Sequence, residues 1–237
     1  MPRWISADRA NCSHTLIIKE VNKLSNHNDA LKGAIQPSDW KKMPAVFSDG
    51  NLSIAGHSVM EDWEDSYMQE LAQIATSNSG VVLELGFGLG ISATYVQQQP
   101  IDKHIIIEAN DEVFVKLEEF AKKAQHEVEP KLGLWEEVIP SIPDASVDGI
   151  LLDTYLASEE DEKFYCFPFF KHAYRILKKG GIFTYFSYEA SDFSPQHLQS
   201  LQTAGFSNIQ KKVCALNTPD ECVYWKSKTM IAPIVRK

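Results

Sequence analysis

The sequence predicts an α/β fold in which a doubly wound, mainly parallel sheet carries helices on both faces. From residue 81 onward, short apolar runs alternate with helix-like segments, a pattern typical of such a sheet. The first run, Val81–Leu85, leads directly into a glycine-rich turn, where the backbone can approach a ligand closely. The second run, Ile105–Glu108, ends in an acid. These features predict a ligand site at the carboxyl ends of the strands.

The N-terminal quarter is less regular, and we expect residues 1–57 to form an extension and lid segment. Residues 15–24 show a weak amphipathic pattern, and residues 37–57 read as an irregular segment. The main domain is expected over residues 58–237. Ser58, with Glu61 three positions later, suggests a capping box that starts a helix. An apolar stripe of helical period supports this helix: Met60, Trp63, Tyr67, Leu71 and Ile74.

The remaining elements follow in alternation. Helices are expected near Ile91–Gln99, Asp111–Gln125 and Pro195–Ala204, with another ending at Lys179. Further strands are expected at Gly149–Asp153, Ile182–Phe186, Asn208–Leu216 and Cys222–Val235.

Composition narrows the class of substrate. The 237 residues fit one α/β domain, and the formal net charge is −9, which disfavours nucleic acid as a partner. No apolar stretch approaches the ~20 residues of a membrane span, and the N-terminus has no pattern of a secretory signal. The four cysteines lack C-x-x-C spacing, which suggests free thiols rather than disulfides or a zinc site. We therefore expect a cytoplasmic protein, monomer or homodimer, with a small cationic or neutral substrate.

The glycine spacing distinguishes between nucleotide ligands. Gly86-x-Gly88-x-Gly90 differs from the G-x-G-x-x-G of dinucleotide sites, and Glu84 precedes it. A carboxylate there opposes a pyrophosphate and suits S-adenosylmethionine, which carries a sulfonium and an ammonium. Glu108 is placed to accept hydrogen bonds from both ribose hydroxyls. A tight strand–helix connection without a ligand is the alternative.

Two further carboxylates are candidates for catalysis. Glu64 shares one face of the expected helix with Met60 and Met68, at i, i+4 and i+8. Asp153 stands at the carboxyl tip of a central strand. Two carboxylates in one pocket match a planar guanidinium, which presents paired donors. The alternatives are a solvated Glu64 at the edge of the stripe and a loop or capping role for Asp153.

Several stretches resemble the guanidinoacetate N-methyltransferase family, which makes creatine from guanidinoacetate. The matching stretches lie at residues 59–68, 83–88, 107–111, 131–136, 148–155, 177–181, 220–225 and 230–235. The resemblance covers roughly Pro37 to the C-terminus. It implies a Rossmann-like class I methyltransferase fold, with S-adenosylmethionine as the methyl donor.

The resemblance also implies roles for individual residues. Glu64 and Asp153 grip the guanidinium, and Asp153 is the general base. Cofactor contacts are expected from Trp40, Met60, Met68, Glu84, Gly86, Phe87, Gly88, Leu89, Gly90, Ile91, Ser92, Glu108, Ala109, Asn110, Trp135 and Glu136. Tyr155, Tyr188 and Glu189 are expected beside the substrate. Without the resemblance, each Met and Trp of this set reads as a core residue.

One loop departs from the family pattern. The family captures the substrate carboxylate with backbone amides of a Leu-Thr-Ser-like loop, whereas this chain has residues 187–191, Ser-Tyr-Glu-Ala-Ser. Glu189 would repel a carboxylate if it turned inward, and the loop that follows is shortened. Another guanidino compound, such as an arginine-like metabolite or a protein arginine, therefore stays open. So does a non-catalytic module that binds S-adenosylmethionine. A nucleic-acid methyltransferase is disfavoured by the charge and by the absence of an Asn/Asp-Pro-Pro-aromatic motif.

Overall fold

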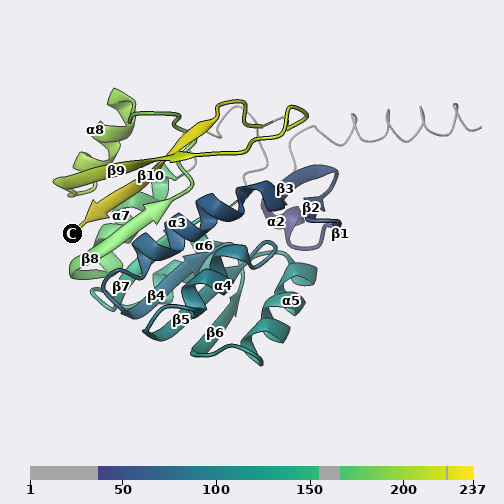
Figure 1. Ribbon diagram of the computed structural model, residues 1–237. Coiled ribbons are helices and arrows are strands. Elements are labelled where there is room, and N and C mark those ends of the chain that lie inside the picture. Colours follow the sequence, from purple (N-terminus) through teal and green to yellow (C-terminus); the bar gives the residue numbers. More distant parts are fainter. Residues whose placement is uncertain (1–36, 155–165, 223) are drawn as a thin grey trace, which may run out of the picture. The chain divides into compact units, whose positions relative to one another are not determined.

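A seven-stranded sheet forms the centre of the fold (Figure 1). Its strand order is β6-β5-β4-β7-β8-β10-β9. The first five strands run parallel, while β10 is antiparallel to both of its neighbours. The strands are β4 (Gly80–Leu85), β5 (Ile101–Glu108), β6 (Glu127–Leu132), β7 (Val147–Leu152), β8 (Leu177–Tyr185), β9 (Asn208–Ala215) and β10 (Thr229–Arg236). The predicted fold class is confirmed.

Helices cover both faces of this sheet in the computed structural model, which describes residues 37–154, 166–222 and 224–237. The helices are α2 (Pro37–Trp40), α3 (Asp65–Ala75), α4 (Ile91–Gln97), α5 (Asp111–Ala121), α6 (Trp135–Val138), α7 (Phe167–Ile176) and α8 (Pro195–Thr203). In Figure 1, α3 and α4 cross in front of the sheet, and α7 lies behind it.

The core is divided between the two faces because neighbouring residues of a strand point to opposite sides. In β4, Leu83 and Leu85 belong to the apolar cluster that includes α7, whereas Val82 belongs to the cluster that includes α3. Gly149 of β7 allows α3 to approach closely, because a Cβ there would lie 1.8 Å from the carbonyl oxygen of Ala75. The C-terminal end of α3 is thus held at the start of β7, which directs its N-terminal end toward the carboxyl ends of the strands.

A separate three-stranded antiparallel sheet precedes α3, and here the sequence-based expectation was wrong. It consists of β1 (Ala45–Ser48), β2 (Asn51–Ile54) and β3 (His57–Glu61), where we expected an irregular segment followed by a helix from Ser58. Ala55 and Gly56 both have positive φ, 52° and 79°, and they form the tight turn of a hairpin. Ser58 lies in β3, and its hydroxyl donates to Glu61 at 2.8 Å.

The helix begins seven residues later than expected, at Asp65, after a 3₁₀ turn over Asp62–Glu64. Met60 therefore belongs to β3, and it does not share a helical face with Glu64 and Met68 as we predicted. The expected boundary between residues 57 and 58 falls inside the small sheet.

Three other differences have local causes. Strand β6 was not expected, because its sequence has no apolar run. It is an edge strand with mostly half-buried side chains. Helix α7 ends at Ile176 instead of Lys179, since β8 already begins at Leu177. Strand β10 begins at Thr229, not at Cys222.

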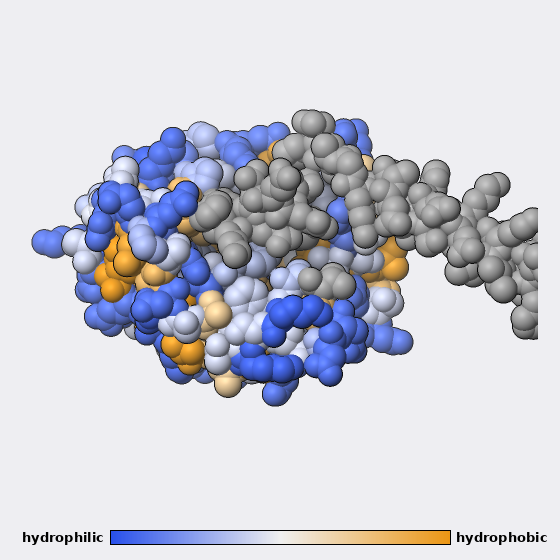
Figure 2. Space-filling view, turned by 90° about the horizontal axis from the view of Figure 1, so that it is seen from above, coloured by the Kyte–Doolittle hydropathy of each residue, from blue (hydrophilic) through white to orange (hydrophobic). Residues whose placement is uncertain are grey.

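The described surface is largely polar, and apolar residues on the face shown in Figure 2 form separate small patches. Within the described ranges, no helix has the length and apolar character to span a membrane.

Candidate active site

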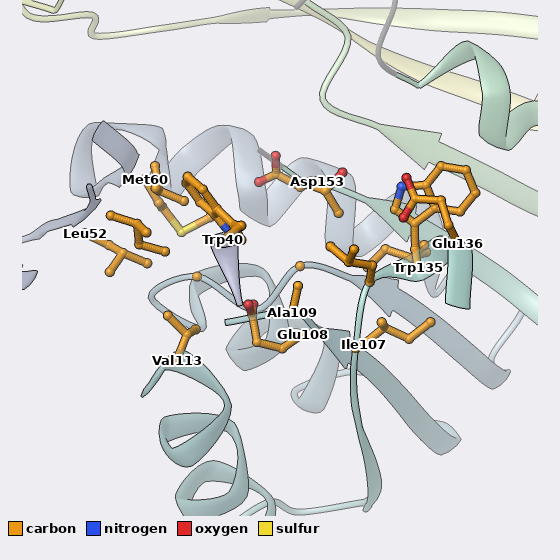
Figure 3. Close-up of a pocket in the computed structure, with 18 residues that line it drawn as sticks. Trp40, Leu52, Met60, Ile107, Glu108, Ala109, Val113, Trp135, Glu136 and Asp153 are labelled. Atoms are coloured by element: carbon orange, nitrogen blue, oxygen red, sulfur yellow. The ribbon is translucent and has the colours of Figure 1, made fainter. Parts of the chain in front are cut away.

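A pocket lies at the carboxyl ends of β4, β5 and β7, where the fold class predicts a ligand site. The space between its walls amounts to about 930 Å³, including space open to solvent. Figure 3 shows its labelled side chains around a common space, with Asp153 above and Glu108 below. The lining residues are Trp40, Leu52, Ile54, Val59, Met60, Leu85, Gly86, Gly88, Ile107, Glu108, Ala109, Val113, Gly133, Leu134, Trp135, Glu136, Asp153 and Thr154.

The glycine-rich turn after β4 brings two neighbouring segments close to the backbone. Gly86 has φ +88°, and a Cβ there would lie 1.9 Å from the carbonyl oxygen of Asp153. A Cβ on Gly88 would lie 2.9 Å from the sulfur of Met60, which also accepts the Leu89 N–H at 3.4 Å. Because Gly86 and Gly88 have no side chains, Asp153 and Met60 can approach the same turn from two sides.

Glu108 holds the glycine turn and its own loop together. Its Oε2 accepts the Phe87 N–H at 2.9 Å, and its Oε1 accepts the Asn110 N–H at 2.8 Å. Burial raises the pKa of Glu108, while these backbone donors act to lower it. Each carboxylate oxygen has a second lone pair, so the group can still accept ribose hydroxyls.

The segment Trp40–Ala45 is fixed against the loop that follows β5. The Asn110 side-chain amide donates to the carbonyls of Trp40, at 3.0 Å, and Met43, at 2.8 Å. The Asp111 N–H donates to the Lys41 carbonyl at 2.9 Å. Trp40 is 8% exposed and lines the pocket. These contacts build one pocket wall from the N-terminal part of the domain.

Trp135 and Glu136 close another side of the pocket from the start of α6. Trp135 packs edge-on against Phe169 and His172, which fixes its ring. Glu136 lines the pocket but is exposed, and partial desolvation of its carboxyl group raises its pKa.

Asp153 follows β7 directly, and its backbone N–H donates to the Leu85 carbonyl at 2.9 Å. Its carboxyl group lines the pocket. Burial raises the pKa of Asp153 to about 7, and the negative charge of Glu84 adds to this effect. A carboxyl group with such a pKa is suited to take up a proton near neutral pH.

Glu64 closes the 3₁₀ turn before α3 and is 3% exposed. Burial, together with the negative charge of Asp153, raises the pKa of Glu64 to about 8. Hydrogen bonds from the Tyr224 hydroxyl and the Glu61 N–H oppose this shift. The negative charge of Asp153 thus acts on the Glu64 carboxyl group, although Glu64 itself is not among the residues that line the pocket.

Several predicted cofactor contacts lie outside the lining of this pocket. Glu84 is fully buried, where it accepts the Ser92 hydroxyl and lies 2.8 Å from Nε2 of His104. Met68 is enclosed in the apolar cluster around α3. The Asn110 side chain caps α5 and holds the Trp40–Ala45 segment. Phe87, Leu89, Gly90 and Ile91 complete the turn and the start of α4.

In the loop after β8, the Glu189 carboxylate is engaged by other groups of the protein. Oε1 of Glu189 accepts the Ser194 N–H at 3.1 Å and lies 3.6 Å from Nδ1 of buried His197. Tyr188 has a positive φ of 52° and stacks near Phe186. Tyr155, the third residue predicted beside the substrate, lies outside the described residues.

The sequence interpretation missed part of the pocket lining. Leu52, Ile54 and Val59 come from the small sheet that we did not expect. The alternation of Asn51-Leu52-Ser53-Ile54 was the available signal. Gly133 and Leu134 lie between β6 and α6, where the sequence predicted neither a strand nor a helix. Among the described residues, no group of three or more His, Cys, Asp or Glu side chains is arranged to hold a metal ion.

Solved structures establish the class of fold. TYW2 of M. jannaschii in complex with AdoMet matches with a TM-score of 0.57 at 15% identity, over 82% of this chain and 84% of that chain. Spermidine synthase from Thermotoga maritima matches with a TM-score of 0.56 at 14% identity, over 81% and 72%. Together with the acid that ends β5 and the glycine turn after β4, these similarities define a class I methyltransferase fold.

The family model described as guanidinoacetate N-methyltransferase matches residues 31–237. The chain belongs to this family, whose cofactor is S-adenosylmethionine, and the resemblance found in the sequence is confirmed.

Curated relatives bear a different name. "Protein arginine N-methyltransferase 2" of Yarrowia lipolytica is 32% identical over 179 residues, which cover 71% of this chain and 37% of that protein. The protein of the same name from Saccharomyces cerevisiae is 26% identical over 57% of this chain and 34% of its own length. The chain thus spans about a third of the length of these relatives.

The position of Glu108 in the pocket leads to a first prediction. The Glu108→Ala substitution is expected to weaken S-adenosylmethionine binding by about 10- to 150-fold, because it removes a hydrogen bond to a charged group. Isothermal titration calorimetry measures this change. Glu108→Gln keeps one acceptor oxygen and should lose less, and Glu129→Ala on the edge strand β6 is the control. Unchanged affinity in Glu108→Ala would exclude a ribose contact.

Proposed function

We propose that this chain is an S-adenosylmethionine-dependent N-methyltransferase that acts on a guanidino group, with guanidinoacetate as the first candidate substrate. The observation that carries the proposal is the pair Glu64 and Asp153. Both have raised pKa values, and the charge of one acts on the other. Two such carboxyl groups, at the end of the sheet where the pocket lies, are suited to a flat cation.

The pocket fits the methyl donor by its chemistry. Glu108 offers carboxylate oxygens for a ribose, while Trp40, Leu52 and Ile107 offer apolar surface for a base. When bound, S-adenosylmethionine supplies an electrophilic methyl group on a sulfonium. We assign Trp135 and Glu136 to the far side of the same ligand.

The chain's carboxylates bind and orient the substrate. A free guanidinium is a poor nucleophile, because it stays protonated at neutral pH and its lone pairs are delocalised. Glu64 and Asp153 would hold it by hydrogen bonds, so that one nitrogen faces the methyl carbon in line with the leaving sulfur. As that nitrogen forms its bond to carbon, Asp153 accepts the proton from it, and Glu64 stays ionised to balance the remaining cation.

Substrate binding also explains how both groups become charged. Without a ligand, burial and mutual repulsion favour the protonated forms. A guanidinium between them supplies the positive charge that stabilises both carboxylates. The proposed substrate thus creates the base that acts on it.

A second candidate is a protein arginine, because curated relatives bear the name of protein arginine methyltransferases. Guanidinoacetate stays the first candidate, because the family model that matches residues 31–237 bears its name and the Glu189 carboxylate is already engaged by the Ser194 N–H.

Radiolabelled methyl transfer across a panel of acceptors tests the proposal. The panel contains guanidinoacetate, free arginine, an arginine-containing peptide and a non-guanidino amine. We expect transfer to guanidinoacetate and none to the amine. Transfer to the peptide alone would assign the second candidate. Cofactor binding without transfer to any guanidino compound would contradict the proposal and indicate a binding module.

A further inference from the structure

A tyrosine far away in the sequence holds one of the two carboxyl groups. Tyr224 lies in the connection between β9 and β10, and its hydroxyl donates to Oε1 of Glu64 at 2.6 Å, across 160 residues of sequence. The Trp63 ring, next to Glu64 in the chain, lies 5.9 Å from the Tyr224 ring, tilted by 30°. The connection between the last two strands therefore reaches the 3₁₀ turn that carries Glu64.

The two oxygens of Glu64 are held unequally. Oε1 accepts both the Tyr224 hydroxyl and, at 3.2 Å, the Glu61 N–H. Among the described residues, no hydrogen-bond donor reaches Oε2. One oxygen is thus fixed by the protein, and the other is left for a ligand.

We propose that Tyr224 is a positioning residue, which fixes Oε1 of Glu64 so that Oε2 receives one N–H of the guanidino substrate. This inference rests on the proposed function. Glu64 then binds the substrate through a single oxygen, because the other is already engaged by two donors. Tyr224 would set the angle of the Glu64 carboxylate without contacting the reacting atoms.

The charges around Glu64 determine the effect of removing this contact. Asp153 faces Glu64 from the end of β7, Glu61 from β3 and Tyr224 from the β9–β10 connection. The two acids disfavour ionised Glu64, whereas the tyrosine hydroxyl favours it. Without the hydroxyl, Glu64 should ionise only at higher pH, and substrate binding should follow.

The test compares Tyr224→Phe with a matched control. Tyr95→Phe removes a second tyrosine–carboxylate hydrogen bond, 2.8 Å to Asp65, the residue directly after Glu64, on the exposed side. In Tyr224→Phe, we expect the acid limb of kcat/KM for the guanidino substrate to move up by about one to two pH units. KM should rise while cofactor affinity stays unchanged. In Tyr95→Phe, the profile should match that of the wild type.

A direct titration separates this inference from the proposed function. Infrared difference spectroscopy follows the Glu64 carboxyl group in the ligand-free protein, with Glu64→Gln to assign the band. If the wild type methylates no guanidino compound, the proposed function fails, yet a higher Glu64 pKa in Tyr224→Phe still supports the Tyr224 contact. Identical titrations in the wild type and in Tyr224→Phe would overturn the inference.

A second variant guards against a purely structural effect. Tyr224→His keeps an N–H donor and should shift the pH profile less than Tyr224→Phe, with melting temperatures measured for both. Equal shifts in the two variants would show that donation to Glu64 is not the cause, and would also overturn the inference.

Discussion

Asp153→Asn is expected to lower the rate of methyl transfer by about 100- to 10,000-fold, the usual contribution of a general base. An amide has nearly the shape of the carboxyl group, but it accepts no proton near neutral pH. Because Glu108 and the glycine turn are untouched, cofactor affinity should stay within about threefold. Single-turnover assays and calorimetry measure the two quantities. Asp144→Asn, at an exposed ion pair with Arg175, is the control.

The same variant should be more stable than the wild type at pH 8. The pKa of Asp153 is raised from 3.8 to about 7, so the folded state binds more protons than the unfolded state between these values. The free energy of unfolding of the wild type therefore falls as pH rises through this window. Asp153→Asn removes this penalty, so its melting temperature should exceed that of the wild type at pH 8 and approach it near pH 4. Lost activity with a lowered melting temperature at pH 8 would contradict the assignment of a buried base.

The pH dependence of kcat/KM should be steep on its acid side. Both carboxyl groups must be ionised to hold the guanidinium, and their pKa values are raised to about 8 and about 7. The fraction with both ionised falls by roughly 500-fold between pH 8 and pH 6. Because kcat/KM reports the free enzyme, its logarithm should approach a slope of two against pH, with the values belonging to the coupled pair.

A matched variant tests whether two carboxyl groups must ionise before the substrate binds. Glu64→Gln removes one of them, so the residual activity should follow a slope of one. A wild-type profile that is flat between pH 6 and pH 8 would mean that the pair is ionised before substrate binds. That outcome would contradict the electrostatic reasoning, although not the fold or the family.

The inner strands β4, β5 and β7 could be predicted because they are largely buried on both faces. Val81–Leu85 and Ile105–Glu108 read as nearly continuous apolar runs, and their carboxyl ends fix where Glu108 and Asp153 lie. Local sequence was enough here, since topology alone brings these ends to one edge.

The other half of the site depends on contacts that a local pattern does not contain. Met60 repeats with Glu64 and Met68 at helical spacing, yet it forms part of β3, because pairing with Leu52 in β2 outweighs the local periodicity. The Tyr224 hydrogen bond joins segments that are distant along the chain, so no spacing rule could reveal it. Asn110 was expected among the cofactor contacts, and no local pattern indicates that its side-chain amide donates to the carbonyls of Trp40 and Met43.

Asn110 also has a kinetic consequence. Its side chain caps α5 and donates hydrogen bonds to the Trp40–Ala45 segment. This segment forms one wall of the pocket. The demethylated product differs from the methyl donor only by a methyl group and its charge, so a donor bound behind this wall and its product would be held alike. We therefore expect slow release of the product, and faster release when these two hydrogen bonds are removed.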